Sequence, residues 1–176
     1  MVRNRLDLAA IIQNDGRFAI APHYRAGLLS PADLRRLADV AERFEVQAIK
    51  LGSAGRPILV GIEENRIEEA WKALGVPRGA AIGLCLRSIK CCPGARFCPF
   101  GQQDTIALCM ELEDRFQGRP LPNKFKIGVS GCPHQCAENA IKDLAFQGTS
   151  TGYRVQIGGN GGAAPRLSQR LCDVEN

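Results

Sequence analysis

Apolar residues recur at two different spacings along the first 78 residues, one typical of strands and the other of helices. Short apolar runs rich in β-branched side chains predict three strands, at residues 18–21, 46–51 and 58–62. Two stretches carry an apolar residue every three or four positions, as one helix face does, at residues 34–44 and 67–74. The order strand, helix, two strands, helix is most of a ferredoxin-like, split βαβ unit.

Both predicted helices have boundary signals. Ser30 is suited to cap the first helix, with Pro31 at the first helical position and Asp33 three residues after the cap. Gly75 and Pro77 end the second helix, because glycine readily takes a left-handed conformation and proline cannot continue a helix.

The pattern changes after residue 78. Strands are predicted at 81–89, 125–129 and 153–157, and helices at 104–116 and 137–142. Loops rich in Cys, Pro and Gly interrupt them, and the last ten residues are expected to be loosely held. The sequence therefore predicts an α+β protein with two domains, residues 1–78 and 79–176.

Composition narrows the class of protein. Of the 176 residues, 45% are hydrophobic and 23% charged, which is ordinary globular usage. The chain lacks both an apolar run of about 20 residues and a signal-peptide pattern, so we expect a cytoplasmic protein without a membrane span. The net charge of +5 is spread without a basic run and aromatic residues make up 6%, which argues against a nucleic-acid partner.

Eight cysteines point to metal or redox chemistry, because disulfides are rare in a reducing compartment. Cys92 and Cys98 form a C-x5-C loop, and Cys132 and Cys136 form a C-x3-C loop. Four thiolates from two loops can converge on one iron–sulfur cluster, which tolerates varied spacing. A structural zinc usually takes tighter C-x2–4-C pairs and remains an alternative.

The other four cysteines have simpler interpretations. Cys85 and Cys109 lie in apolar segments and are expected to be buried, while Cys172 lies near the end of the chain. Cys91 is next to Cys92 and is the second choice as a ligand.

The segment S-G-C-x3-C at residues 130–136, followed after six residues by D-L-A-F at 143–146, resembles a known signature. It is similar to that of the nitrite and sulfite reductases that contain sirohaem and a [4Fe–4S] cluster. Further similarities are the C-P-G-x3-C segment at 92–98, L-P-N-K-F-K at 121–126 and I-G-G-N-G-G at 157–162. The first 78 residues resemble the ferredoxin-like half domain of this family, so the expected second domain binds sirohaem and the cluster.

The resemblance implies a cluster held by Cys92, Cys98, Cys132 and Cys136. Cys136 would also bridge the cluster to the iron of sirohaem, and the substrate would bind the opposite face of the macrocycle. The implied reaction is the six-electron reduction of sulfite to sulfide or of nitrite to ammonia. A non-catalytic iron–sulfur electron-transfer or tetrapyrrole-binding module is the alternative function.

The implied catalytic residues are cations, which can bind an oxyanion and supply protons. Lys124 and Lys126 match the paired lysines of the family, and alternate residues of a strand share one face. Arg87 resembles an arginine that the family uses near substrate and cofactor. For each of the three residues, a solvated surface charge is the alternative interpretation.

The carboxylates of sirohaem require a cationic pocket, for which Arg25 and Arg56 are candidates. Gly159, Asn160 and Gly161 can present backbone N–H groups to an anion, or can form a plain turn. The chain departs from the family at residues 18–21, where an arginine is often found and this sequence reads F-A-I-A.

Partners are also implied by the resemblance. Larger members carry two copies of the half domain around one sirohaem and this chain has one, so a homodimer is expected. No G-x-G-x-x-G fingerprint follows a predicted strand, so electrons are expected from a separate ferredoxin or flavoprotein.

Overall fold

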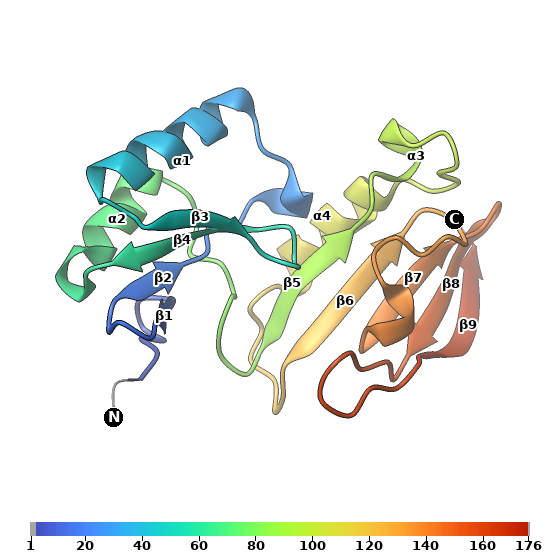
Figure 1. The fold of residues 1–176 in the computed structure, drawn as a ribbon. Coiled ribbons are helices and arrows are strands. Elements are labelled where there is room, and N and C mark those ends of the chain that lie inside the picture. The colour runs from blue at the N-terminus through green and yellow to red at the C-terminus, as the bar shows by residue number, and fades with distance from the viewer. Residues whose placement is uncertain (1–2, 176) are drawn as a thin grey trace. The chain divides into compact units, whose positions relative to one another are not determined.

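The computed structural model describes residues 3–175. The chain divides into two compact units, the first ending at Gly83 and the second beginning at Leu84 (Figure 1). Each unit contains its own β-sheet. Both therefore combine helices with strands, which is the α+β class that the sequence predicts.

The first unit is an antiparallel sheet with two helices packed on it (Figure 1). Its strands, in the spatial order β1-β2-β4-β3, are β1 (Ala10–Ile12), β2 (Phe18–Ile20), β4 (Pro57–Ile62) and β3 (Ala48–Leu51). Its helices are α1 (Pro31–Arg43) and α2 (Ile67–Leu74), with the short 3-10 turns η1 (Arg25–Gly27) and η2 (Glu64–Arg66). Apolar side chains from β2, β4, α1 and α2 form one core.

The boundary signals of the two helices are confirmed. The Ser30 hydroxyl accepts a hydrogen bond from the Asp33 N–H at 3.1 Å, and the Asp33 carboxylate accepts one from the Ser30 N–H at 2.8 Å. This reciprocal pair satisfies two N–H groups that a helix start leaves without partners. Gly75 follows α2 with a left-handed φ of 62°.

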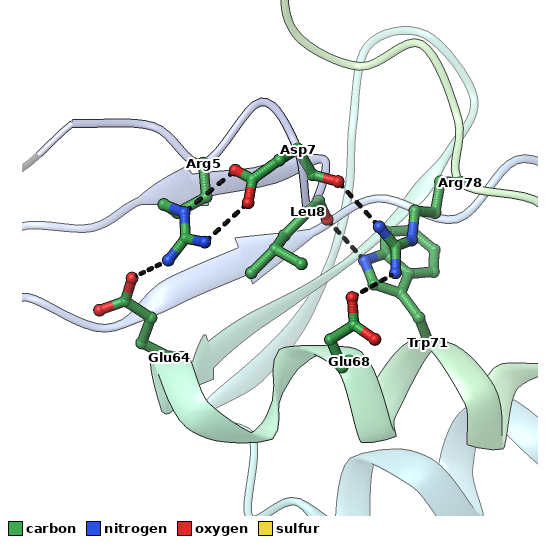
Figure 2. A network of polar contacts seen from close by, with 7 residues as sticks. All are labelled: Arg5, Asp7, Leu8, Glu64, Glu68, Trp71 and Arg78. Carbon is green, nitrogen blue, oxygen red and sulfur yellow. Dashed lines mark hydrogen bonds and ion pairs between the residues drawn. The ribbon is translucent and has the colours of Figure 1, made fainter.

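The strand β1 is not predicted by the sequence pattern, and the segment just before it bonds to α2 and its flanking residues (Figure 2). The buried Trp71 donates its indole N–H to the Leu8 carbonyl at 2.8 Å. Arg78 donates to the Asp7 carbonyl and to Glu68, and Arg5 pairs with Asp7 and Glu64. The bonds from residues 5–8 to Glu64, Trp71 and Arg78 join residues more than fifty positions apart, so no local periodicity predicts them.

The second unit is a five-stranded mixed sheet in the order β5-β6-β7-β8-β9. Its strands are β5 (Leu86–Cys91), β6 (Phe125–Ser130), β7 (Leu144–Gly148), β8 (Gly152–Ile157) and β9 (Gln169–Glu175). β5, β6 and β7 run parallel, and the remaining pairs are antiparallel. The helix α4 (Thr105–Phe116) packs on β5 and β6, and α3 (Gly94–Phe97) and η3 (Asn139–Ile141) are single turns in the connections.

Several predicted elements of this unit need correction. The strand expected at 81–89 begins at Leu86, and the helix expected at 137–142 is the single 3-10 turn η3. The loop that carries Cys92 and Cys98 includes the single turn α3, and β7 lies at residues 144–148, where no strand is predicted. Residues 169–175, part of the segment expected to be loosely held, form β9 and pair with β8. All seven residues of β9 are exposed, so the strand carries no alternation of buried and polar positions from which to predict it.

We predict that Trp71→Phe lowers the free energy of unfolding of the first unit by about 1–3 kcal/mol, because the Leu8 carbonyl loses its donor inside the protein. Urea unfolding followed by circular dichroism measures this change. Glu68→Gln removes only a solvent-exposed ion pair and is the control, with an expected loss below about 1 kcal/mol. Equal losses in the two variants would contradict the role of the indole N–H.

Candidate metal centre

The two cysteine loops leave the sheet at the same edge. Cys92 directly follows β5, and Cys132 comes two residues after β6 ends. β5 and β6 are parallel neighbours with Cys91 opposite Val129, and the Cys92 N–H continues the ladder to the Val129 carbonyl at 3.0 Å. Parallel pairing therefore brings together two segments that lie about forty positions apart in the chain.

The two loops touch backbone to backbone at Gly131. Its N–H donates to the Cys92 Sγ at 3.2 Å, and its carbonyl accepts from the Gln102 N–H at 2.7 Å. A Cβ atom on Gly131 would lie 2.9 Å from the Gly94 Cα and 3.0 Å from the Gln103 carbonyl oxygen. The approach is therefore possible only because residue 131 has no side chain.

Three more glycines share this close packing. A Cβ on Gly101 would overlap the backbone of Gly94, and a Cβ on Gly148 would overlap that of Gly131. Gly94 has a left-handed φ of 59°, and its own Cβ would lie 2.8 Å from the Gln103 carbonyl oxygen. We call these four residues the glycine contact: Gly94, Gly101, Gly131 and Gly148.

A buried polar pair holds the second cysteine loop to the sheet. The Ser130 hydroxyl donates to the Asn139 Oδ1 at 2.7 Å and accepts from the Ala137 N–H at 3.0 Å. Asn139, which is 0% exposed, also donates to the Phe146 carbonyl at 2.9 Å. The loop between these anchors contains Gln135 and Glu138, two non-glycine residues with left-handed φ angles of 52° and 61°. Such a conformation costs free energy and is held by the surrounding bonds.

All eight cysteines carry free thiols. Of the four predicted ligands, Cys132 is buried, Cys92 and Cys98 are half-buried and Cys136 is exposed. The Cys132 Sγ lies 3.4 Å from the His134 Nδ1. Within residues 3–175, no three His, Cys, Asp or Glu side chains stand in an assembled metal site.

The backbone and the donor atoms nevertheless fit a cluster. A cysteine Sγ moves with the single torsion χ1, so backbone placement decides which thiols are able to share a centre. The two loops are in direct contact, each carries two free thiols, and a backbone N–H already points at the sulfur of Cys92. Soft sulfur donors of this kind suit iron–sulfur clusters.

The alternative ligand Cys91 interacts with Cys109 of α4. This interaction lowers the pKa of the Cys91 thiol and, together with burial, raises the pKa of the Cys109 thiol. Cys85 and Cys109 are buried, which confirms that expectation, and Cys172 lies exposed in β9.

The predicted substrate lysines lie at the start of β6. Lys124 precedes the strand, Lys126 is its second residue, and both are exposed. The Lys126 N–H donates to the Asp143 Oδ2 at 2.8 Å, while the Asp143 carbonyl accepts from the Gly158 N–H at 3.0 Å. Asp143 therefore joins the start of β6 to the glycine run. Arg87, the third predicted cation, is half-buried in β5.

The glycine run packs on the segment that contains η3. A Cβ on Gly159 would lie 2.5 Å from the Lys142 carbonyl oxygen, and one on Gly161 would lie 2.8 Å from the Ile141 Cδ1. The Asn160 N–H donates to the Arg166 carbonyl at 2.9 Å, so this N–H group is used within the protein.

The two predicted sirohaem arginines belong to the first unit. Arg25 begins η1 and is exposed, whereas Arg56 is 5% exposed. A Cβ on Gly79 would lie 2.6 Å from the Arg56 Nη1, so a side chain at residue 79 would displace this guanidinium. The position where the family often has an arginine falls in β2, whose three residues are all buried and apolar.

The second unit also contains a group of ion pairs that the sequence pattern does not predict. The Glu138 carboxylate lies 2.9 Å from the Lys90 Nζ and 2.9 Å from the Lys142 Nζ. Lys90, followed by Lys142, lowers the pKa of Glu138 to about 2. The spacing of four residues could have suggested the pair with Lys142. The pair with Lys90 depends on the pairing of β5 with β6, which no local pattern contains.

The described part of the chain contains no helix that is both long and apolar enough to span a membrane.

Two family models match the chain. Residues 82–174 match the nitrite and sulphite reductase 4Fe-4S domain, and residues 11–76 match the nitrite/sulfite reductase ferredoxin-like half domain.

Individual relatives agree with these matches. The chain is 39% identical to a nitrite reductase [NAD(P)H] of Bacillus subtilis over 94% of its own length, which is 21% of that protein. It is 36% identical to an assimilatory-type sulfite reductase of Nitratidesulfovibrio vulgaris over 93% of its length, which is 76% of that protein. The solved structure of Mycobacterium tuberculosis NirA superposes with a TM-score of 0.78 and 26% identity, over 90% of this chain and 32% of that one.

We predict that Gly131→Ala pushes the two cysteine loops apart, because the new Cβ meets backbone atoms that cannot rotate away. The expected loss in unfolding free energy is about 1–3 kcal/mol, with less iron bound per chain after anaerobic reconstitution. Gly162→Ala is the control, since its Cβ meets only the side chain of Asn160. Wild-type stability and iron content in Gly131→Ala would show that the close contact is not required.

Proposed function

The chain belongs to the family of nitrite and sulphite reductases, and from this premise we propose that it reduces a small oxyanion by six electrons. The cofactors of this family are a [4Fe–4S] cluster and sirohaem. The observation that supports the proposal is the glycine contact, which joins the two loops that each carry a pair of free thiols. The alternative of a structural zinc has no comparable support from the family.

We assign the cluster to Cys92, Cys98, Cys132 and Cys136. Cys136 is the exposed member of the set and is therefore the suitable one to share its sulfur with the iron of sirohaem. The Gly131 N–H supports Cys92 as a ligand, because a backbone donor stabilises negative charge on a thiolate sulfur. When bound, the two cofactors supply electrons one at a time to the oxyanion.

Lys124 and Lys126 would bind the oxyanion and hold the protons that each N–O or S–O cleavage consumes. Both side chains are exposed at the start of β6, and the bond from the Lys126 N–H to Asp143 fixes the backbone beneath one of them. Arg87 is proposed as a further cation for the substrate, because a guanidinium donates two parallel hydrogen bonds to an oxyanion.

The carboxylates of sirohaem would be bound by Arg25, Arg56 and the run that contains Gly159, Asn160 and Gly161. Within this run the Asn160 N–H is already used, so the contribution to an anion would come from its neighbours.

Sulfite and nitrite are the two proposed substrates, because one relative is a sulfite reductase and the Bacillus relative is a nitrite reductase. The proposed partners are a ferredoxin or flavoprotein that donates electrons, and a second copy of the chain. The proposed compartment is the cytoplasm, in keeping with eight free thiols.

One observation favours a non-catalytic electron-transfer or tetrapyrrole-binding module as a second candidate. All three residues of β2 are buried and apolar, so this strand offers no cation to an oxyanion. The two functions differ in their dependence on Lys124 and Lys126, which only the enzyme requires.

We predict that the anaerobically purified protein shows a Soret and a red absorption band of sirohaem together with a broad cluster absorption. Cys136→Ser should abolish sulfite and nitrite reduction and the magnetic coupling between cluster and haem. Cys172→Ser, which changes an exposed thiol in β9, is the control and should keep both properties. A cluster spectrum without haem bands would favour the non-catalytic module, and a colourless zinc-containing protein would refute both functions.

We predict that Lys126→Met lowers turnover of the oxyanion by about 10²-fold or more while sirohaem content stays unchanged, because a proton donor is lost. Steady-state assays with sulfite and with nitrite, using a reduced viologen as donor, measure the change. Lys72→Met alters an exposed lysine of α2 and is the matched control. Equal losses of turnover and sirohaem in Lys126→Met would make this residue a cofactor contact instead.

A further inference from the structure

The ion pairs among Lys90, Glu138 and Lys142 join the two segments that carry the proposed ligands of the iron–sulfur cluster. Lys90 is two residues before Cys92, and Glu138 is two residues after Cys136. The glycine contact fixes the beginning of the second cysteine loop, at Gly131. The ion pairs lie at the other end of the same loop, where Cys136 is exposed.

The lysines reach Glu138 because of where the sheet places them. Lys90 of β5 lies opposite Gly128 of β6. A Cβ on Gly128 would lie 2.9 Å from the Lys142 Cγ, so the stem of Lys142 crosses β6 in the space that this glycine leaves. The side chains of Lys142, Lys90 and Glu138 are 10%, 26% and 46% exposed. Partial burial of this kind weakens screening by solvent and strengthens both ion pairs.

The backbone conformation of Glu138 also indicates that its side-chain interactions are important. Its φ of 61° and ψ of 41° are left-handed, a conformation that glycine or asparagine adopts at lower cost. Its N–H donates to the Gln135 carbonyl at 2.8 Å, and Gln135 itself has a φ of 52°. A glutamate at this position therefore needs a side-chain interaction that offsets the strain.

We propose that Glu138 is a positioning residue for the iron–sulfur cluster and acts by holding the loop that carries Cys136. Its ion pair with Lys90 holds the end of the second cysteine loop against β5, and its pair with Lys142 fixes the carboxylate from within its own segment, so that the Cys136 sulfur keeps a fixed place relative to Cys92. This inference rests on the proposed function, because it requires that these two cysteines ligate the cluster.

Two substitutions separate the ion pairs from the backbone strain. Glu138→Gln keeps the shape of the side chain but removes its charge, and Glu138→Gly removes both the charge and the strain. Each variant is reconstituted anaerobically with iron and sulfide, and the loss of cluster absorbance is followed in the presence of a chelator. We expect loss about tenfold faster than wild type in both variants, as for residues of one interacting network. Lys90→Met/Glu138→Gln should be no faster than Glu138→Gln alone, because both changes break the same pair.

A control and two further readouts distinguish positioning from general stability. Glu111→Gln breaks the surface pair between Glu111 and Arg115 on α4 and should leave the rate of cluster loss unchanged. The thermal midpoint of each cluster-free chain reports stability alone. The electron paramagnetic resonance signal and the midpoint potential of the reduced cluster should change in the Glu138 variants and stay constant in the control.

The outcomes are distinguishable. Wild-type rates, signal and potential in both Glu138 variants would overturn the positioning role and leave the proposed function intact. Faster loss that follows only a lower midpoint of the cluster-free chain, with an unchanged signal and potential, would also overturn it. A wild-type chain that takes up zinc but no iron–sulfur cluster would overturn the proposed function and this inference together.

Discussion

Backbone atoms from two distant segments meet at the glycine contact with no room for a side chain between them, and the proposed metal centre depends on this packing. Parallel pairing of β5 and β6 brings the segments to one edge of the sheet, but pairing alone leaves two loops free to diverge. The absence of a Cβ at Gly131 lets its N–H reach the Cys92 sulfur and its carbonyl reach the Gln102 N–H. A steric requirement on one atom thus determines where the thiols can lie.

Much of the architecture can be predicted from the sequence, because it depends on residues that are close together in the chain. The Ser30 cap, the apolar face of α1 and the spacing of the cysteines are each contained within about a dozen residues. The strands β1, β7 and β9 are not predicted by the sequence pattern. The segment just before β1 bonds to the distant Trp71 and Arg78, β7 is defined by its pairing with β6 and β8, and every residue of β9 is exposed, so long-range contacts define these strands.

The candidate site shows the same division. The cysteine motifs identify the family and predict the donors, because ligand spacing is a local property. The ion pair between Lys90 and Glu138 could not be predicted, because it requires the register of β5 against β6 and a left-handed backbone at Glu138. The role of Gly128 is likewise visible only once Lys142 is seen to cross the strand.

Asp143 has a double attachment whose consequence reaches beyond its own position. Its carboxylate is bound to the Lys126 N–H and its carbonyl to the Gly158 N–H, so one residue spans the strand start and the glycine run. The two regions cannot shift independently, and any molecule that displaces the run also moves the base of Lys126. The proposed sites for the large macrocycle and for the small anion would thereby be held in position by the same residue, Asp143.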